Sequence, residues 1–226
     1  MRQGEYYCLA VCSTLGMCVM ASAGDLIVLY LGLELMALPI YALAALRTGD
    51  TRSSESAIKY FLMGSFASAL LLFGMSLLYG LTGHTELTQI AAVLPVAANG
   101  QTLPALVVAL ALMLAGMGFK VAAAPFHVWV PDVYEGAPTT VTAFMSVAAK
   151  TASFAVLARV LVMALPQMGT QWSGALAFMA ALTMLLGNIA AVMQTSLKRM
   201  LAYSAIAHAG YALLGIAACT AEGLRA

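Results

Sequence analysis

The sequence predicts an all-α fold, a polytopic bundle of transmembrane helices, and three observations support this prediction. Hydrophobic residues make up 63% of the 226 residues and charged residues only 8%, against about 25% charged residues in soluble domains. Seven apolar stretches are long enough to cross a hydrocarbon core, which needs about 20 helical residues. None of them alternates apolar and polar residues as a barrel strand does. The chain is therefore predicted to form a single transmembrane domain over residues 1–226.

The predicted spans follow one another with mostly short connections. Polar residues together with Gly, Asp or Pro separate the first span from the second, the second from the third and the fifth from the sixth. The single long connection, residues 82–102, contains Gly, Pro, Asn and Thr and is predicted to be an exposed extramembrane loop. The seven predicted spans are residues 6–22, 26–46, 57–81, 103–130, 138–165, 172–194 and 200–218.

The distribution of basic residues predicts the orientation. When crossings are counted from the N-terminus, the opposite side receives only Arg225. The first side receives Arg2, Arg47, Arg52, Lys59, Lys198 and Arg199. By the positive-inside rule the first side is cytoplasmic, so the Arg47–Arg52 and Lys198–Arg199 loops are predicted to be cytoplasmic in an inner (cytoplasmic) membrane. A net charge of +1 leaves no basic surface for nucleic acid.

Cofactor motifs are absent from the sequence. The four cysteines form no CxxC pair, and a metal or iron–sulfur site needs about four converging ligands. The sequence also lacks a GxxxxGK[ST] loop, a GxGxxG turn and a GxSxG elbow. We therefore expect no metal and no bound cofactor in this chain, and we interpret the cysteines as small packing residues.

Three charged residues fall near the middle of predicted spans, where a charge costs several kcal/mol unless it is paired, protonated or facing water. Glu34 and Lys150 lie well inside their spans, and Lys120 precedes Pro125 by five residues. Pro125 and Pro131 predict a discontinuous helix near Lys120–Pro131, and broken backbone at this depth survives only inside protein or beside a cavity. The alternatives are a packing ion pair at Glu34 and a simple proline kink with an incidental salt bridge at Lys120.

Histidines and two further basic residues complete the candidate set. His127 lies beside the predicted break, and His208 lies within the last span. Either could relay protons near neutral pH, although a membrane histidine more often forms a helix–helix hydrogen bond. Arg159 lies half a turn in azimuth from Lys150 and near a helix end, so we interpret it as structural. Lys59 is either a cytoplasmic anchor or a transport residue.

Carboxylates and amines buried at similar depth suit proton movement. Burial favours the neutral amine, whereas an approaching carboxylate favours the ammonium. A carboxylate that moves toward or away from a buried lysine can therefore switch its protonation, and the two groups titrate as a unit. This chemistry requires no cofactor.

Several segments together resemble the antiporter-like subunit N, or subunit 2, family of proton-pumping NADH:quinone oxidoreductase, respiratory complex I. The Pro-Phe-His-x-Trp-x-Pro run at 125–131 is shared with Mrp-type cation/proton antiporter subunits. The Pro-Asp-Val-Tyr-Glu-Gly-Ala-Pro run at 131–138 is more specific to subunit N. The segments that carry the resemblance are residues 31–35, 55–61, 118–120, 125–129, 131–139 and 196–204.

The resemblance implies a proton-translocating membrane subunit that corresponds to the middle portion of a larger chain. Glu34, Lys120 and Lys150 would match the family's membrane glutamate, the lysine of its broken helix and its central lysine. Lys59 would match a further lysine, and His208 would lie on the family's hydrophilic axis. NADH, FMN, iron–sulfur clusters and quinone would bind partner subunits of the complex. An Mrp-type antiporter subunit and a fragment that packs without transporting are the alternatives.

Overall fold

Helices make up nearly all of the structure, a computed structural model that describes residues 3–97, 100–220 and 222–224. Seven helical segments in these ranges are long and apolar enough to cross a membrane, which confirms the predicted polytopic bundle. Arg2 and Arg225, used above to predict the orientation, lie outside the described residues. The seven segments are Gln3–Ser22, Leu26–Ala44, Thr51–Thr82, Leu103–Val121, Thr139–Ala164, Pro166–Val192 and Leu197–Ala217.

The first hairpin joins α1 (Gln3–Ser22) to α2 (Leu26–Ala44) through a short turn. Asp25 caps α2, because its carboxylate accepts hydrogen bonds from the backbone N–H groups of Ile27 (2.8 Å) and Val28 (3.3 Å). The two helices cross where Gly32 meets α1, and a Cβ at Gly32 would lie 2.6 Å from the Met20 backbone nitrogen. Small residues at the crossing thus let two membrane helices approach closely.

Helix α3 (Thr51–Thr82) begins at Thr51 rather than at residue 57. Asp50 caps it by accepting from the Arg52 N–H (3.0 Å), and its first two turns carry charged residues. A hydropathy pattern marks only the apolar part of such a helix, which explains the difference. The helix ends at Gly83, whose φ of 72° is the left-handed conformation that glycine adopts readily.

The connection between the third and fourth spans, predicted as an extramembrane loop over 82–102, contains a short helix, α4 (Leu87–Ala97). Leu87, Ile90 and Leu94 recur at helical spacing and are fully buried. The Leu87 N–H donates to the Gly24 carbonyl (2.9 Å), which ties α4 to the α1–α2 turn. With 11 residues, α4 is shorter than a membrane span, so a search for apolar stretches of span length does not find it.

The predicted discontinuous helix is present. Helix α5 (Leu103–Val121) ends at Ala122, which has a φ of 64°, and α6 (Trp129–Gly136) begins after an irregular segment. Pro131 lies in the first turn of α6, where its missing N–H has no helical partner to lose. The helix is therefore interrupted after Val121, in a segment that contains Pro125, and resumes at Trp129.

The fifth span is one continuous helical rod with two wider turns. It comprises α7 (Thr139–Phe144), the π-helical turn η1 (Met145–Ala149), α8 (Lys150–Arg159) and the π-helical turn η2 (Val160–Ala164). π-Helical turns are rare and are frequently found at functional sites. Lys150 is the first residue after η1.

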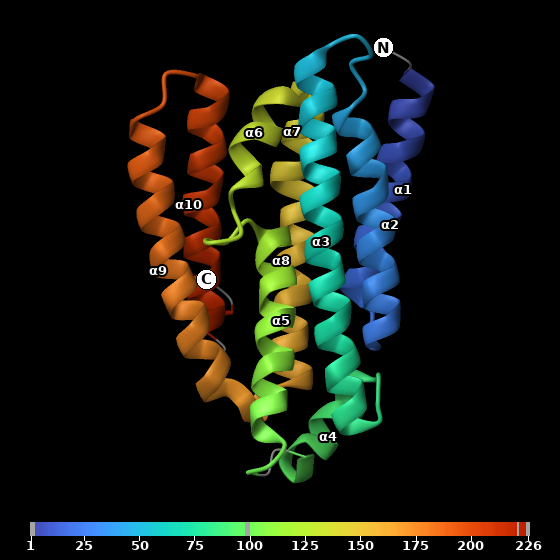
Figure 1. The fold of residues 1–226 in the computed structure, drawn as a ribbon, viewed down its shortest axis with the longest axis vertical. Coiled ribbons are helices and arrows are strands. Elements are labelled where there is room, and N and C mark those ends of the chain that lie inside the picture. The colour runs from blue at the N-terminus through green and yellow to red at the C-terminus, as the bar shows by residue number, and fades with distance from the viewer. Residues whose placement is uncertain (1–2, 98–99, 221, 225–226) are drawn as a thin grey trace.

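The last hairpin consists of α9 (Gly169–Val192), preceded by the 3-10 turn η3 (Pro166–Met168), and α10 (Leu197–Ala217). Glycines again mark the crossing, since a Cβ at Gly187 would lie 2.7 Å from the Ala207 nitrogen. Figure 1 shows α9 and α10 on one side of the bundle, α1 and α2 on the other, and α3, α5 and α8 between them. Helix α5 ends part-way along the bundle, and α6 continues toward the end where α3 begins.

Candidate functional site

Lys120 lies in the last turn of α5 and is buried, with 7% of its surface exposed. Its Nζ donates to the hydroxyl of Tyr41 on α2 at 3.4 Å and lies 5.8 Å from the centre of the Tyr41 ring. It lies 5.9 Å from the centre of the Phe119 ring. The C-terminal end of a helix carries partial negative charge, so the end of α5 is a favourable place for an ammonium.

Glu34 lies on α2, seven residues before Tyr41, which places the two side chains on nearly the same face about 10 Å apart along the axis. It is half-buried, and its Oε1 has no hydrogen-bond partner among the described residues. In the described part of the chain, however, the hydrogen-bond partner of Lys120 is Tyr41 rather than this carboxylate.

Lys150 is also buried, with 8% of its surface exposed. Its Nζ donates to the backbone carbonyl of Ala205 on α10 at 2.7 Å. The preceding π-helical turn changes the direction of the residues that follow it, which sets where Lys150 points. Two lysines from neighbouring helices are thus buried with neutral hydrogen-bond acceptors.

The break between α5 and α6 is packed with aromatic rings. Trp129 stacks on Tyr60 (centroids 4.5 Å apart) and on Phe119 (5.1 Å), and its Nε1 donates to the Phe119 carbonyl at 3.1 Å. The Ala124 N–H, inside the break, donates to the Thr183 hydroxyl of α9 at 2.8 Å. These contacts satisfy backbone groups that the broken helix leaves free, as burial requires.

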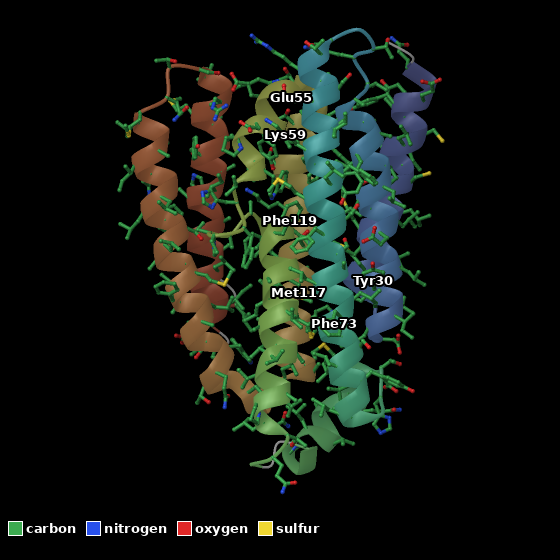
Figure 2. All side chains as sticks on the ribbon, viewed as in Figure 1. Tyr30, Glu55, Lys59, Phe73, Met117 and Phe119 are labelled. Atoms are coloured by element: carbon green, nitrogen blue, oxygen red, sulfur yellow. The ribbon has the colours of Figure 1, made fainter. Side chains whose placement is uncertain are left out.

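A polar cavity of about 280 Å³ lies beside α6, at the end of the bundle where α3 begins. Five charged side chains around it form salt bridges with one another, and we name them the ion-pair cluster. Lys59 Nζ contacts Glu55 (2.7 Å) and Asp132 (3.1 Å), and Arg199 Nη1 contacts Asp132 (3.0 Å) and Glu135 (3.1 Å). Figure 2 shows Glu55 and Lys59 near one end of α3 and Phe119 deeper in the bundle. The stacked aromatic rings connect these two regions.

The remaining candidates lie apart from the two buried lysines. His127 is half-buried in the break, and its Nδ1 has no hydrogen-bond partner among the described residues. His208 is exposed on α10 and meets the edge of Tyr211, with centroids 5.4 Å apart. Arg159 donates to the carbonyls of Ala21 (2.9 Å) and Ala23 (3.0 Å), so it binds the end of α1, as a structural residue would.

Among the described residues, Lys120, Lys150 and Lys59 each bond to residues that were not predicted as site residues. Sequence reasoning selected Lys120 and Lys150 by their depth but missed Tyr41 and Thr183, which hold Lys120 and the break beside it. It also missed Asp132, the carboxylate shared by two cations in the ion-pair cluster. The Pro-Asp-Val-Tyr-Glu run was the available signal for Asp132, since it places two carboxylates in a short helix after a break.

Comparisons with known proteins match the chain to one family of membrane proteins. The pattern of a family described as NADH:quinone oxidoreductase/Mrp antiporter, transmembrane, matches residues 23–226. NADH-quinone oxidoreductase subunit N of Desulfovibrio desulfuricans is 77% identical, over 100% of this chain and 45% of that protein. The chain thus spans about half the length of the curated relatives it matches.

Two solved assemblies contain chains of the same fold. A chain of respiratory complex I from Thermus thermophilus has a TM-score of 0.80 and 45% identity, over 94% of this chain and 45% of that chain. A chain of the Mrp complex from Dietzia has a TM-score of 0.83 and 28% identity, over 92% of this chain and 38% of that chain.

Proposed function

Because the chain belongs to the NADH:quinone oxidoreductase/Mrp antiporter transmembrane family, we propose that it translocates protons as a membrane subunit of an NADH:quinone oxidoreductase. Lys120 and Lys150 carry the protons in this proposal, and Glu34 biases the charge of Lys120. NADH oxidation and quinone reduction belong to partner subunits, which hold FMN and the iron–sulfur clusters. The Arg47–Arg52 and Lys198–Arg199 loops face the cytoplasm.

The observation that supports this role most directly is the pair of buried lysines with neutral hydrogen-bond acceptors. Lys120 bonds to a hydroxyl and Lys150 to a carbonyl. A buried lysine locked in a close ion pair would keep its proton, whereas one with a neutral partner can lose it at modest cost. Glu34 acts on Lys120 without direct contact, so a small displacement of α2 would change that influence.

The ion-pair cluster holds the second half of the broken helix. Lys59 on α3 and Arg199 on α10 both bind Asp132 of α6, and Lys198 donates to the carbonyls of Glu135 (3.1 Å) and Ala137 (2.7 Å) at the end of α6. We assign Lys59 to this positioning role at the cytoplasmic end. His127, with its free ring nitrogen, is an auxiliary proton carrier, and His208 has the lower weight because it is exposed.

An Mrp-type cation/proton antiporter subunit is the second candidate function. The fold supports both candidates similarly, with TM-scores of 0.80 and 0.83. Identity favours the oxidoreductase, at 45% against 28%. Sodium-dependent proton transport by the assembled complex, independent of NADH, would select the antiporter.

Replacing Lys120 by alanine in the assembled complex tests the proposal. Lys120→Ala is expected to lower the number of protons transported per NADH oxidised while the amount of assembled complex stays nearly unchanged. Met117→Ala is the matched control, since Met117 is also buried on α5, about one turn earlier, and carries no charge. An unchanged number of protons transported per NADH in Lys120→Ala would exclude the assigned role. The alternative would then be a chain that packs in the complex without transporting protons.

A further inference from the structure

Tyr41 contacts Lys120 more closely than any other described side chain with a hydrogen-bonding group. Tyr41 is 93% buried, on a helix separate from that of Lys120. A buried hydroxyl costs free energy unless it forms a hydrogen bond, and the bond to the Lys120 amine meets that need. The amine lies beyond the hydroxyl end of the ring, 5.8 Å from the ring centre.

The Tyr41 ring is fixed from two sides by α3. Tyr60 meets it edge-on with centroids 4.8 Å apart, and Phe61 does so at 5.8 Å. The Tyr41 hydroxyl points at Gly64, which also lies on α3. A Cβ at Gly64 would overlap the Tyr41 oxygen and lie 2.8 Å from the ring carbon that bears it. Glycine is therefore the residue that leaves room for this hydroxyl, because a held aromatic ring cannot swing aside as a flexible chain can.

We infer that Tyr41 is the positioning residue for Lys120 in proton transfer and that Gly64 provides the space for its hydroxyl. A tyrosine hydroxyl can accept a hydrogen bond from an ammonium and can donate one to a neutral amine. The same contact thus holds Lys120 before and after its proton leaves. This inference rests on the proposed function, since it assumes that Lys120 is a proton carrier.

The position of Tyr41 on α2 also links it to Glu34. The two residues are seven apart and share a face of the helix. Displacement of α2 would therefore change the hydrogen bond to Lys120 and the distance from the carboxylate together. Proton transport would therefore depend on the position of α2 through a hydrogen bond and through a charge–charge interaction.

Variants of the assembled complex test the inference by removing the hydroxyl and by crowding it. Tyr41→Phe keeps the ring and is expected to lower proton transport per NADH about twofold to tenfold, the size expected for the loss of one ordinary hydrogen bond. Gly64→Ala, whose added Cβ would overlap the Tyr41 oxygen, is expected to lower transport by a similar factor. The same change is expected to cost less when it is added to Tyr41→Phe, because the oxygen nearest to the added Cβ is then absent.

Control variants separate this inference from general damage to the protein and from the proposed function. Tyr79→Phe changes an exposed ring of α3, and Gly80→Ala adds a Cβ to the same helix where no atom lies within 4 Å. Both variants are expected to behave as wild type. An equal loss from Gly64→Ala in the tyrosine and the phenylalanine backgrounds, or normal transport in Tyr41→Phe, would overturn the inference. If Lys120→Ala lowers transport while Tyr41→Phe does not, only the role of Tyr41 fails. If Lys120→Ala is also unaltered, the proposed function fails with it.

Discussion

Thr183 should stabilise the break beside Lys120 through one hydroxyl. This side chain is fully buried on α9, accepts a hydrogen bond from the Ala124 N–H at 2.8 Å and donates to the Met179 carbonyl. Thr183→Val replaces the hydroxyl by a methyl group of nearly the same size. The packing of the side chain is thereby kept, while the Ala124 N–H loses its partner at a depth where water cannot replace it.

The cost of this change can be estimated from the single bond that is lost. Hydrogen bonds between membrane helices contribute about 0.6 kcal/mol on average and up to about 1.7, and an unsatisfied buried donor costs about 1–3 kcal/mol. We expect Thr183→Val to destabilise the hydrogen-bonded conformation of the break by about 1–2 kcal/mol. This corresponds to a roughly 5-fold to 30-fold increase in the equilibrium constant for its local opening.

Hydrogen exchange followed by mass spectrometry measures this opening directly. Peptides covering residues 122–126 should exchange roughly 5–30 times faster in Thr183→Val than in wild type. Thr183→Ser retains the hydroxyl and should keep the protection close to the wild-type value. Peptides from α1, far along the chain from this contact, serve as an internal control. Wild-type protection in the valine variant, or equal loss in both variants, would refute the role of the hydroxyl.

Two further predictions concern the stability of the bundle. The Thr85 hydroxyl, together with the N–H groups of Ile27 and Val28, lowers the pKa of the Asp25 carboxyl, against a smaller opposing effect of burial. A lowered pKa in the folded state means that the stabilisation exists above pH of about 4 and is lost as pH falls further. Asp25→Ala should therefore lower the free energy of unfolding by about 1 kcal/mol at pH 7, as measured by thermal unfolding. This difference from wild type should shrink below pH of about 4, and a difference that grows on acidification would contradict the assignment. Gly32→Ala should destabilise the α1–α2 crossing by about 1–3 kcal/mol, whereas Gly80→Ala, where nothing lies within 4 Å, should be neutral or slightly stabilising; the same sign and size for both would show that close approach is not the cause.

The sequence predicted the spans well because hydrophobic length alone identifies a membrane helix. All seven segments are present, and the break follows from Pro125, which can neither donate a hydrogen bond nor continue the helix. Boundaries were less accurate where polar residues continue a helix beyond the apolar part. Helix α3 begins at Thr51 for this reason, and α4 was not predicted because its 11 residues are too few to span a membrane.

The contacts of the site were less predictable, since a membrane helix is apolar on all sides. In a soluble helix the polar face indicates which way each residue points, but Leu31, Leu35 and Leu38 of α2 are exposed while other apolar residues of the same helix are buried. The depth of Lys120 along its helix could be predicted, but the neighbouring helix toward which its side chain points could not. Its pairing with Tyr41 depends on that direction and on a glycine of a third helix.

Lys120 is held by elements that are distant in sequence, and this has a mechanical consequence. The break frees α5 to end at mid-bundle, Tyr41 of α2 binds the amine, and Thr183 of α9 fixes the chain just beyond it. Tyr60 and Trp129 connect the same region to α3 and α6, whose far end is bound by the ion-pair cluster. A signal that tilts any one of these helices reaches the lysine within one or two contacts. Helix α2 carries both Tyr41, a hydrogen-bond partner of the amine, and the half-buried carboxylate of Glu34, so a tilt of this helix would move both groups.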